Sequence, residues 1–230
     1  MSLVFAAPAT VTVPVQGGGD FPVHRIYCVG RNYTEHAVEM GFTGREPPFF
    51  FLKPADAVVV VPEGETGVIE YPSLTANLHH EIELVVALGK GGRDIKAADA
   101  AAHIFGYAVG LDMTRRDLQN DMKKQGRPWC IGKAFDQSAP IGPIVPIART
   151  GELTRGAITL SVGGVVRQKG DLSELIWNVA ETIEHLSAAW LLQPGDLIYS
   201  GTPAGVAAVV RGDVMEGSVE GVGSLSVAVR

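Results

Sequence analysis

Apolar and polar residues alternate along several short segments of the chain, and glycine, proline or polar turn residues bound these segments. Neighbouring side chains of an extended strand point to opposite faces, so a period of two is typical of a half-buried strand. The pattern predicts strands at residues 57–61, 81–88, 107–111, 157–162, 196–199 and 225–229. We therefore expect many short strands joined by tight turns.

Helices are predicted at fewer places. The clearest spans residues 172–192, where apolar residues recur at three- and four-residue steps. Asp171 or Ser173 would cap its start, and Gly195 lies beyond its end. Shorter helices are predicted at residues 34–40, 96–104 and 114–125.

The order of these elements favours an α+β fold that is mainly β. No strand–helix–strand unit repeats and no glycine-rich phosphate loop opens a helix, so a doubly wound nucleotide-binding fold is disfavoured. Residues 1–22 are expected to form an N-terminal arm or an added strand, and residues 23–230 a single domain. With 46% apolar and 19% charged residues, the chain can bury a substantial core.

Composition narrows the possible partners. A net charge of −6 and scattered basic residues offer no surface for a polyanion, so we expect no nucleic-acid partner. No apolar stretch is long enough to span a bilayer, and no basic start precedes an apolar run, so we expect a cytoplasmic protein without a membrane partner. Cys28 and Cys130 lack metal-ligand spacing and are expected to be buried, reduced thiols.

The segment HHEIELVVALG carries the strongest chemical pattern. On a strand, Glu81 and Glu83 share one face while Ile82 and Leu84 point into the core. Two neighbouring carboxylates repel each other and favour a bound cation. A solvated strand face is the alternative, and spacing alone does not decide between the two.

A third acid, Asp112, ends the apolar segment FGYAVGLD and favours the metal site. A cap for the predicted helix at residues 114–125 is a competing role for Asp112. Three oxygen ligands suit Mg²⁺ or Mn²⁺ rather than zinc, and would leave about three octahedral positions for water and substrate. His79 lies on the same strand face, and we expect it to support the ligands rather than bind the metal.

His36 and Glu39 are three residues apart, so they would be neighbours on a helix. Glu39 would then orient His36, which would act as a general base toward water. An ordinary exposed helix pair has the same spacing, so the residues alone leave both interpretations open.

Six sequence blocks in order, from about Arg25 to the C-terminus, resemble the fumarylacetoacetate hydrolase family. The blocks are CVGRNYTEHAVEMG, FFFLKP, HHEIELVVALG, GYAVGLDMTRRDLQ, GRPWCIGKAFD and PGDLIYSGTPAGV. The resemblance implies a mixed β-sandwich roll with peripheral helices, usually assembled as a homodimer. It places the metal ligands on Glu81, Glu83 and Asp112, with Mg²⁺ or Mn²⁺ as the ion and Ca²⁺ as a non-physiological occupant. It also favours catalysis for His36 and Glu39.

The block RQKGDLSELIWNV narrows the resemblance to the short members of the family that hydrolyse acylpyruvates. The implied reaction is hydrolysis of a diketo acid, with fumarylpyruvate as the best candidate, in aromatic catabolism. Lys133 would stabilise the enolate that forms. Expected substrate-binding residues are Arg31, Lys53, Arg116, Gln119 and Thr202.

Two other functions are alternatives to acylpyruvate hydrolysis. Oxaloacetate decarboxylation and diketo-acid isomerisation also pass through an enolate, so the same acids would serve them. A β-rich binding domain with a structural Ca²⁺ is the non-enzymatic alternative.

Overall fold

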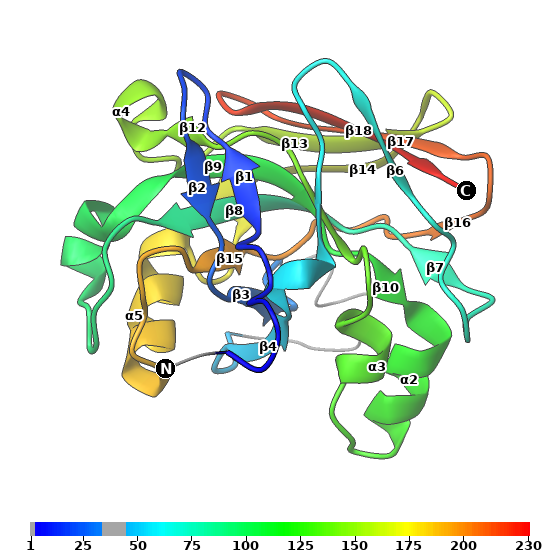
Figure 1. The fold of residues 1–230 in the computed structure, drawn as a ribbon, viewed down its shortest axis with the longest axis horizontal. Helices are drawn as coiled ribbons and strands as arrows, with labels where there is room; N and C mark the ends of the chain where they lie inside the picture. The colour runs from blue at the N-terminus through cyan, green and yellow to red at the C-terminus, as the bar shows by residue number, and fades with distance from the viewer. Residues whose placement is uncertain (1–2, 34–44) are drawn as a thin grey trace.

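The computed structural model describes residues 3–33 and 45–230, and two packed sheets form the body of this part of the chain (Figure 1). The larger sheet has eight strands of mixed direction. Its strands, in order across the sheet, are β4 (Phe49–Lys53), β3 (Ile26–Gly30), β15 (Leu197–Tyr199), β8 (Ile82–Leu88), β9 (Ile104–Leu111), β11 (Ala139–Ile141) and β5 (Val58–Val60), with β12 (Val145–Pro146) also paired to β9.

The second sheet has five strands and covers one face of the first. In order, they are β14 (Val165–Asp171), β13 (Ala157–Val162), β17 (Val214–Val219), β18 (Gly223–Val229) and β6 (Thr66–Ile69). Smaller units are a sheet of β10 (Thr114–Arg115), β7 (Leu78–His79) and β16 (Ala208–Val209), and a hairpin of β1 (Thr12–Pro14) and β2 (Asp20–Pro22).

Helices lie at the periphery, with α5 on one side of the sheets and α2 and α3 on the other (Figure 1). Their bounds are α2 (Arg116–Lys124), α3 (Cys130–Lys133), α4 (Ile147–Thr150) and α5 (Val179–Ala189), with short 3₁₀ helices at η1 (Ala55–Ala57), η2 (Ala97–His103) and η3 (Leu172–Glu174). No helix among the described residues combines the length and the apolar character that crossing a membrane requires.

All six predicted strands are present, and their ends differ from the predicted ones by at most three residues. The predicted helix at 172–192 is wrong in extent, because the segment divides into η3 and α5. Asn178 begins α5 with a capping box of its own, while Ile176 and Trp177 donate their backbone N–H groups to Asn32. These long-range bonds hold the segment extended where local periodicity favours a helix.

The shorter predicted helices differ in detail. Residues 97–103 form a 3₁₀ helix, and residues 114–115 form β10 before α2 begins at Arg116. The predicted helix at 34–40 lies outside the described residues.

The prediction that both cysteines are buried is right for Cys28 and wrong for Cys130, which is exposed.

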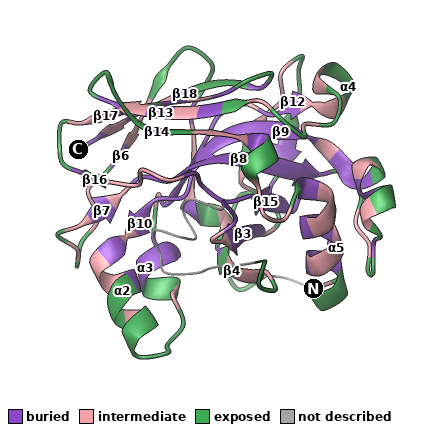
Figure 2. Cartoon of the chain, turned by 180° about the vertical axis from the view of Figure 1, so that it is seen from behind, coloured by how far each residue is buried: buried purple, intermediate pink, exposed green. Residues whose placement is uncertain are grey.

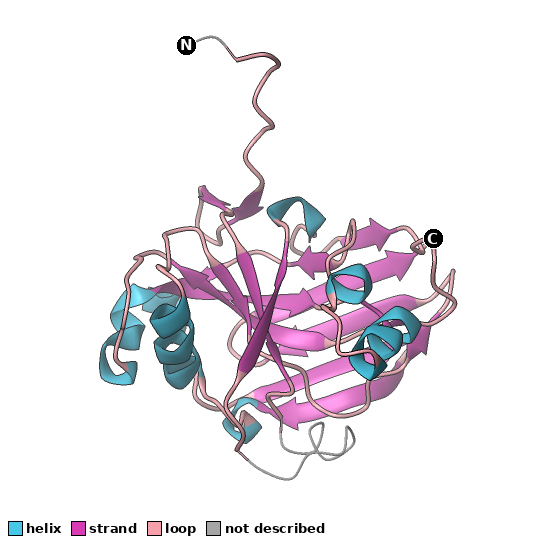
Figure 3. Ribbon diagram, turned by 90° about the horizontal axis from the view of Figure 1, so that it is seen from below, coloured by secondary structure: helices cyan, strands magenta, loops and turns pink. Residues whose placement is uncertain are grey.

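The hairpin β1–β2 packs its buried Val13 and Phe21 against the larger sheet, and the preceding residues extend away from the body (Figure 3). Leu3 and Phe5 of this extension are 72% and 77% exposed. The assignment of residues 23–230 to a single domain stays a prediction.

The central strand β8 separates two apolar clusters, and all seven of its residues are buried (Figure 2). Leu84 and Val86 pack between the two sheets, whereas Val85 and Ala87 pack on the other face of the larger sheet. Glu83 shares the face of Val85, because alternate residues of a strand point the same way.

Pairing with β9 then completes the acidic group. Ile82 lies opposite Leu111, and the backbone N–H of Asp112 donates to the carbonyl of Glu81 at 2.9 Å. The antiparallel register therefore places Asp112 beside Glu81, and Glu83 two residues further along the same face of β8.

Candidate active site

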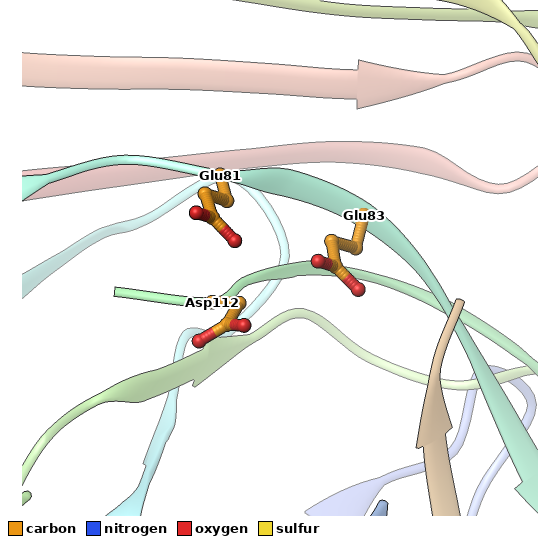
Figure 4. A group of neighbouring side chains, drawn as sticks. All are labelled: Glu81, Glu83 and Asp112. Atoms are coloured by element: carbon orange, nitrogen blue, oxygen red, sulfur yellow. The ribbon is translucent and has the colours of Figure 1, made fainter. Parts of the chain in front are cut away.

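Three carboxylates converge where β8 begins and β9 ends (Figure 4). One ligand oxygen from each of Glu81, Glu83 and Asp112 lies within 4.8 Å of the others. Their side chains are buried, at 5%, 1% and 1% residue exposure, so a solvated strand face is excluded. The alternative role of Asp112 as a helix cap is wrong too, because α2 begins after Arg115 without a side-chain cap.

Lys133, at the end of α3, donates all three of its ammonium hydrogens inside this group. Its Nζ lies 2.7 Å from Glu81 Oε2, 2.7 Å from Asp112 Oδ2 and 2.7 Å from Thr114 Oγ1. Burial lowers the pKa of Lys133, but the carboxylates of Asp112 and Glu81 outweigh this effect and raise it above its ordinary value. Lys133 is therefore a firmly charged cation in contact with two of the three acids.

Lys53 supports Asp112 from the other side. Its Nζ lies 2.8 Å from Asp112 Oδ1, and it also donates to the carbonyl of Met113 at 3.2 Å and to the carbonyl of Lys133. The Lys53 side chain is 0% exposed. Asp112 thus lies between two ammonium groups. Its Oδ2 accepts a hydrogen bond from Lys133, whereas its Oδ1 has the ion-pair contact with Lys53 but no hydrogen bond among the described residues.

Arg116, the first residue of α2, links Glu81 to two further polar side chains. Its guanidinium donates to Glu81 Oε1, to Gln119 Oε1 at 2.6 Å and to His79 Nδ1 at 3.3 Å. The second ring nitrogen of His79 bonds Asn77 Oδ1 at 2.9 Å, so both nitrogens are occupied. Burial and the charge of Arg116 lower the pKa of His79 to about 4, so the ring is neutral at pH 7 and supports Arg116.

Glu83 differs from the other two acids in its partners. Its Oε2 accepts the backbone N–H of Gly201 at 2.7 Å, and no lysine or arginine of the described residues forms a salt bridge with it. Burial, followed by the negative charges of Asp112 and Glu81, raises the pKa of Glu83 well above its ordinary value. A bound cation would remove this repulsion.

The acids lie at the base of a narrow cavity that is continuous with solvent. Charged and polar residues line part of it: Glu81, Glu83, Arg116, Gln119, Lys133 and Thr202. Arg31, Phe51 and Trp129 line the rest together with Val29 and Gly30. Cations and carboxylates therefore both face the space next to the acids.

Arg31 holds its guanidinium over two aromatic rings at the edge of this cavity. The guanidinium carbon lies 5.1 Å from the centre of the Phe49 ring and 5.8 Å from that of Trp129. These rings also line a second, apolar hollow beside the cavity, which extends over β4 and residues 127–130.

The chain is similar to proteins of one known family. The family model described as fumarylacetoacetate (FAA) hydrolase C-terminal matches residues 25–230. The chain belongs to the fumarylacetoacetate hydrolase family. It is 57% identical to a fumarylpyruvate hydrolase of Pseudomonas aeruginosa, solved with Mn²⁺ and pyruvate, with a TM-score of 0.97 and 99% of both chains covered.

Curated members of the family include proteins of different activity. A fumarylpyruvate hydrolase of Ralstonia sp is 45% identical over 185 residues, covering 80% of this chain and 93% of the relative. A mitochondrial oxaloacetate decarboxylase of Dictyostelium discoideum is 39% identical over 197 residues, covering 86% and 89%. The predicted family and its mainly β fold with peripheral helices are thus confirmed.

The residues present fit the divalent metal that the family implies. All three candidate ligands are carboxylate oxygens, which hard ions such as Mg²⁺ and Mn²⁺ prefer. Glu83 is buried with two like charges nearby and no ion-pair partner among the described residues, so a cation is the missing component. Glu81, Glu83 and Asp112 would hold the ion.

The structure brings together Lys133, Arg116 and Gln119 as expected, but it changes two predicted roles. Lys53 is enclosed behind Asp112 and does not line the cavity, so it supports a ligand instead of meeting the substrate. Thr202 lines the cavity, but its hydroxyl hydrogen is donated to the carbonyl of Ile82 at 2.7 Å, so it is not available for a substrate carboxylate. His36 and Glu39 lie outside the described residues, and their catalytic role stays a prediction.

Two amide side chains near the acids were missed. Asn32 and Gln168 are 1% and 0% exposed, and each bonds groups more than thirty residues away in sequence. Gln168 is the one buried residue of β14, among polar and small neighbours that give no periodic pattern. A single amide in such a segment carries no signal that sequence reasoning could use.

Proposed function

We propose that the chain is a divalent-metal-dependent hydrolase that cleaves the carbon–carbon bond of an acylpyruvate. Fumarylpyruvate, which would yield fumarate and pyruvate, is the best candidate substrate. The observation that carries the proposal is the buried group of Glu81, Glu83 and Asp112 at the base of an open cavity. Similarity to a fumarylpyruvate hydrolase that holds Mn²⁺ and pyruvate supports the choice of substrate.

The charge of the site favours an anionic substrate. Three carboxylates face two ammonium groups and one guanidinium, from Lys53, Lys133 and Arg116, so the ionised side chains balance one another. A divalent ion would leave two positive charges in a buried cluster. The keto-acid carboxylate would offset one of them, and the enolate that forms during the reaction would offset the other.

When bound, the metal would supply Lewis-acid polarisation of the keto acid that it chelates. His36, oriented by Glu39, would take a proton from a water molecule, whose oxygen adds to the distal acyl carbonyl. Collapse of the adduct breaks the carbon–carbon bond, and the electron pair goes to the pyruvate half as an enolate. Protonated His36 returns its proton to the enolate carbon, which gives pyruvate, and the acyl half leaves as a carboxylic acid.

Lys133 and Arg116 would assist the reaction by contacting the substrate directly. Lys133 lines the cavity as a charged donor, so exchange of one of its present hydrogen bonds would let it stabilise the enolate oxygen. Arg116 and Gln119 lie side by side on the cavity wall and would orient the keto-acid carboxylate.

Arg31 would bind the far end of the substrate. It lies in the cavity wall with Phe51 and Trp129, where the two aromatic side chains would flank the planar fumaryl group. Fumarylpyruvate differs in charge from acetylpyruvate only by the carboxylate of its fumaryl group. Recognition by an arginine would therefore select the dicarboxylate.

Oxaloacetate decarboxylation is the second candidate, and the similarity to a mitochondrial oxaloacetate decarboxylase favours it. The two reactions share the enolate but differ in the need for water. Only hydrolysis requires a base that activates water, which is the role proposed for His36.

The deciding experiment is an assay of fumarylpyruvate, acetylpyruvate and oxaloacetate with Mg²⁺, with Mn²⁺ and with a chelator. Release of pyruvate with fumarate from fumarylpyruvate, lost in the chelator, is the expected result. His36→Ala should abolish hydrolysis while largely sparing metal-driven release of CO₂ from oxaloacetate, and His185→Ala is the matched control. Wild-type activity on oxaloacetate alone would reject the hydrolase assignment, and unchanged hydrolysis in His36→Ala would reject the base.

A further inference from the structure

Gln168 is a fully buried side chain in a strand whose other residues are exposed or partly exposed. Its amide makes four hydrogen bonds, which is all that the group can make. Nε2 donates to Thr202 Oγ1 at 2.7 Å and to the carbonyl of Pro203 at 2.8 Å. Oε1 accepts from the backbone N–H of Ile82 at 3.1 Å and from His80 Nδ1 at 2.8 Å.

These four bonds join two segments that carry metal-site groups. His80 and Ile82 are the residues on either side of Glu81. Thr202 and Pro203 directly follow Gly201, whose backbone N–H holds Glu83 at 2.7 Å. Gln168 therefore connects the backbone around one acid to the loop that orients the other.

A second amide holds the same loop from the opposite end. Asn32 Nδ2 donates to the carbonyl of Ser200 at 2.7 Å, directly before Gly201. Gly201 has a φ of 103°, and a Cβ at this position would lie 2.6 Å from Asn32 Cβ. The loop thus has contact with Asn32 on one side and with Gln168 on the other.

The loop also lies against the backbone of β14 itself. Gly205 has a φ of 94°, and a Cβ there would lie 2.1 Å from the carbonyl oxygen of Arg167, the residue before Gln168. This close approach leaves the loop little room to move toward the strand. The amide of Gln168 supplies the directional bonds that keep it from moving away.

We propose that Gln168 is a positioning residue of the metal centre. It bonds the residues on both sides of Glu81, and it also bonds the loop whose Gly201 holds Glu83. In this way it fixes Glu81 relative to Glu83. The proposal rests on the metal site of the proposed function. Gln168 is not one of the three candidate ligands and does not line the cavity, so its effect is on the affinity of the site for the ion. Loss of such supporting bonds typically weakens metal affinity by roughly 10- to 100-fold.

Gln168→Met tests the proposal, because methionine has a similar length and makes none of the four bonds. The probe is Mn²⁺ alone, and the readout is its dissociation constant, from the electron paramagnetic resonance signal of free Mn²⁺ titrated with full-length protein. We expect the constant to rise about 10-fold or more. The melting temperature is measured with and without Mn²⁺, and the stabilisation by Mn²⁺ should shrink in the variant.

Ser187→Ala is the matched control. Ser187 is also 0% exposed, and its hydroxyl bonds the backbone N–H of Ile95 at 2.8 Å and the carbonyl of Glu184 at 3.0 Å, away from the acidic group. We expect it to lower stability while the affinity for Mn²⁺ stays within twofold of wild type. A purely structural role for Gln168 would give the same result as this control.

The outcomes are distinct. Weaker Mn²⁺ binding in Gln168→Met but not in Ser187→Ala supports the proposal, and unchanged binding in Gln168→Met, or equal weakening in both, overturns it. If Gln168→Met does not fold, Thr202→Val decides, because it removes the hydroxyl that joins Gln168 to Ile82, and unchanged affinity there overturns the proposal. Absence of Mn²⁺ binding by the wild type would reject the metal centre itself, and this inference with it.

Discussion

Lys53 Nζ lies 2.8 Å from Asp112 Oδ1, and the two side chains are 0% and 1% exposed. A buried carboxylate that loses its cation keeps the cost of burial without the compensating attraction. Asp112 also has Lys133 at 2.7 Å, so the pair is part of a larger charge-balanced cluster. This relationship makes Lys53 a determinant of stability.

Lys53→Met is expected to lower the free energy of unfolding by about 3 kcal/mol, the lower end of the cost of removing one partner of a buried ion pair, because Lys133 still faces Asp112. Urea denaturation followed by tryptophan fluorescence measures the change. Lys96→Met is the control, since Lys96 is 70% exposed and lies 3.4 Å from Glu184, and solvent screening should make its loss almost without effect on stability. Equal effects of the two substitutions would contradict the role of Lys53.

Glu83→Gln should separate stability from metal binding. The raised pKa of Glu83 comes first from burial and then from Asp112 and Glu81, so neutralising it removes a buried, repelled charge. In a chelator, the variant is expected to be at least as stable as wild type. With Mn²⁺ at 100 times the wild-type dissociation constant, wild type should gain about 2.7 kcal/mol and the variant almost none.

Thermal unfolding with and without Mn²⁺ measures both effects of Glu83→Gln. The control is Glu65→Gln, which changes an exposed glutamate and should leave the gain intact. An undiminished gain in Glu83→Gln would remove Glu83 from the set of ligands.

Arg31→Met tests recognition of the far carboxylate. The side chain lines the cavity with its guanidinium over the rings of Phe49 and Trp129. A hydrogen bond to a charged group contributes about 1.5–3 kcal/mol, so kcat/KM for fumarylpyruvate should fall roughly 10- to 150-fold. Acetylpyruvate lacks the second carboxylate, and its kcat/KM should change far less.

Steady-state assays with fumarylpyruvate and with acetylpyruvate measure these changes in kcat/KM. Arg149→Met is the control, because Arg149 is exposed near the end of α4 and its loss should change kcat/KM for neither substrate. An equal loss on the two substrates would mean that Arg31 supports the cavity as a whole instead of selecting the acyl group.

Local alternation was sufficient to predict β8 and the shared face of Glu81 and Glu83, because the period of a strand depends only on neighbouring residues. The position of Asp112 beside them depends on the register between β8 and β9, which no local pattern encodes. The third acid was found because it ends an apolar strand, and the family resemblance supplied the link that spacing could not.

Long-range hydrogen bonds account for what the sequence did not predict. The helix at 172–192 fails because Asn32, some 145 positions away from Trp177, holds that segment extended. Gln168 escaped notice because its partner His80 lies 88 positions away, and nothing near Gln168 marks it as buried. Amides that bridge distant segments leave the period of a single strand or helix unchanged.

The two cysteines should differ in reactivity. Cys28 is 0% exposed, and burial followed by the charge of Asp112 raises the pKa of its thiol well above its ordinary value. Cys130 is exposed on α3. Since only an accessible thiolate reacts, Ellman's reagent at pH 8 should label one thiol per native chain and two after unfolding in urea.

Single substitutions assign the labelled thiol. Cys130→Ser should abolish native labelling, whereas Cys28→Ser should leave it unchanged. Labelling of two thiols in the native protein would show that Cys28 is reached without unfolding.

Asp117 should make the stability of the fold depend on pH in the acid range. Its carboxylate accepts hydrogen bonds from Thr75 Oγ1 at 2.6 Å, Ala76 N at 3.0 Å and Leu118 N at 2.9 Å, tying the preceding loop to α2. Burial raises the pKa of Asp117, but these bonds outweigh it and bring the pKa below its ordinary value. A carboxylate with a lowered pKa stabilises the fold above its unfolded pKa of about 3.9, and that contribution is lost as pH falls through the folded value.

Asp117→Ala is therefore expected to be less stable than wild type at pH 7, by about 1 kcal/mol, with the difference shrinking below about pH 4. Urea denaturation at a series of pH values from 7 to 3 measures it. Asp121→Ala is the matched control, an exposed aspartate of the same helix that should give no comparable loss at pH 7. A difference between Asp117→Ala and wild type that persists undiminished at pH 3 would mean that the side chain stabilises this corner by packing, because a contribution that comes from a lowered pKa must decline once the unfolded chain binds a proton below about pH 3.9.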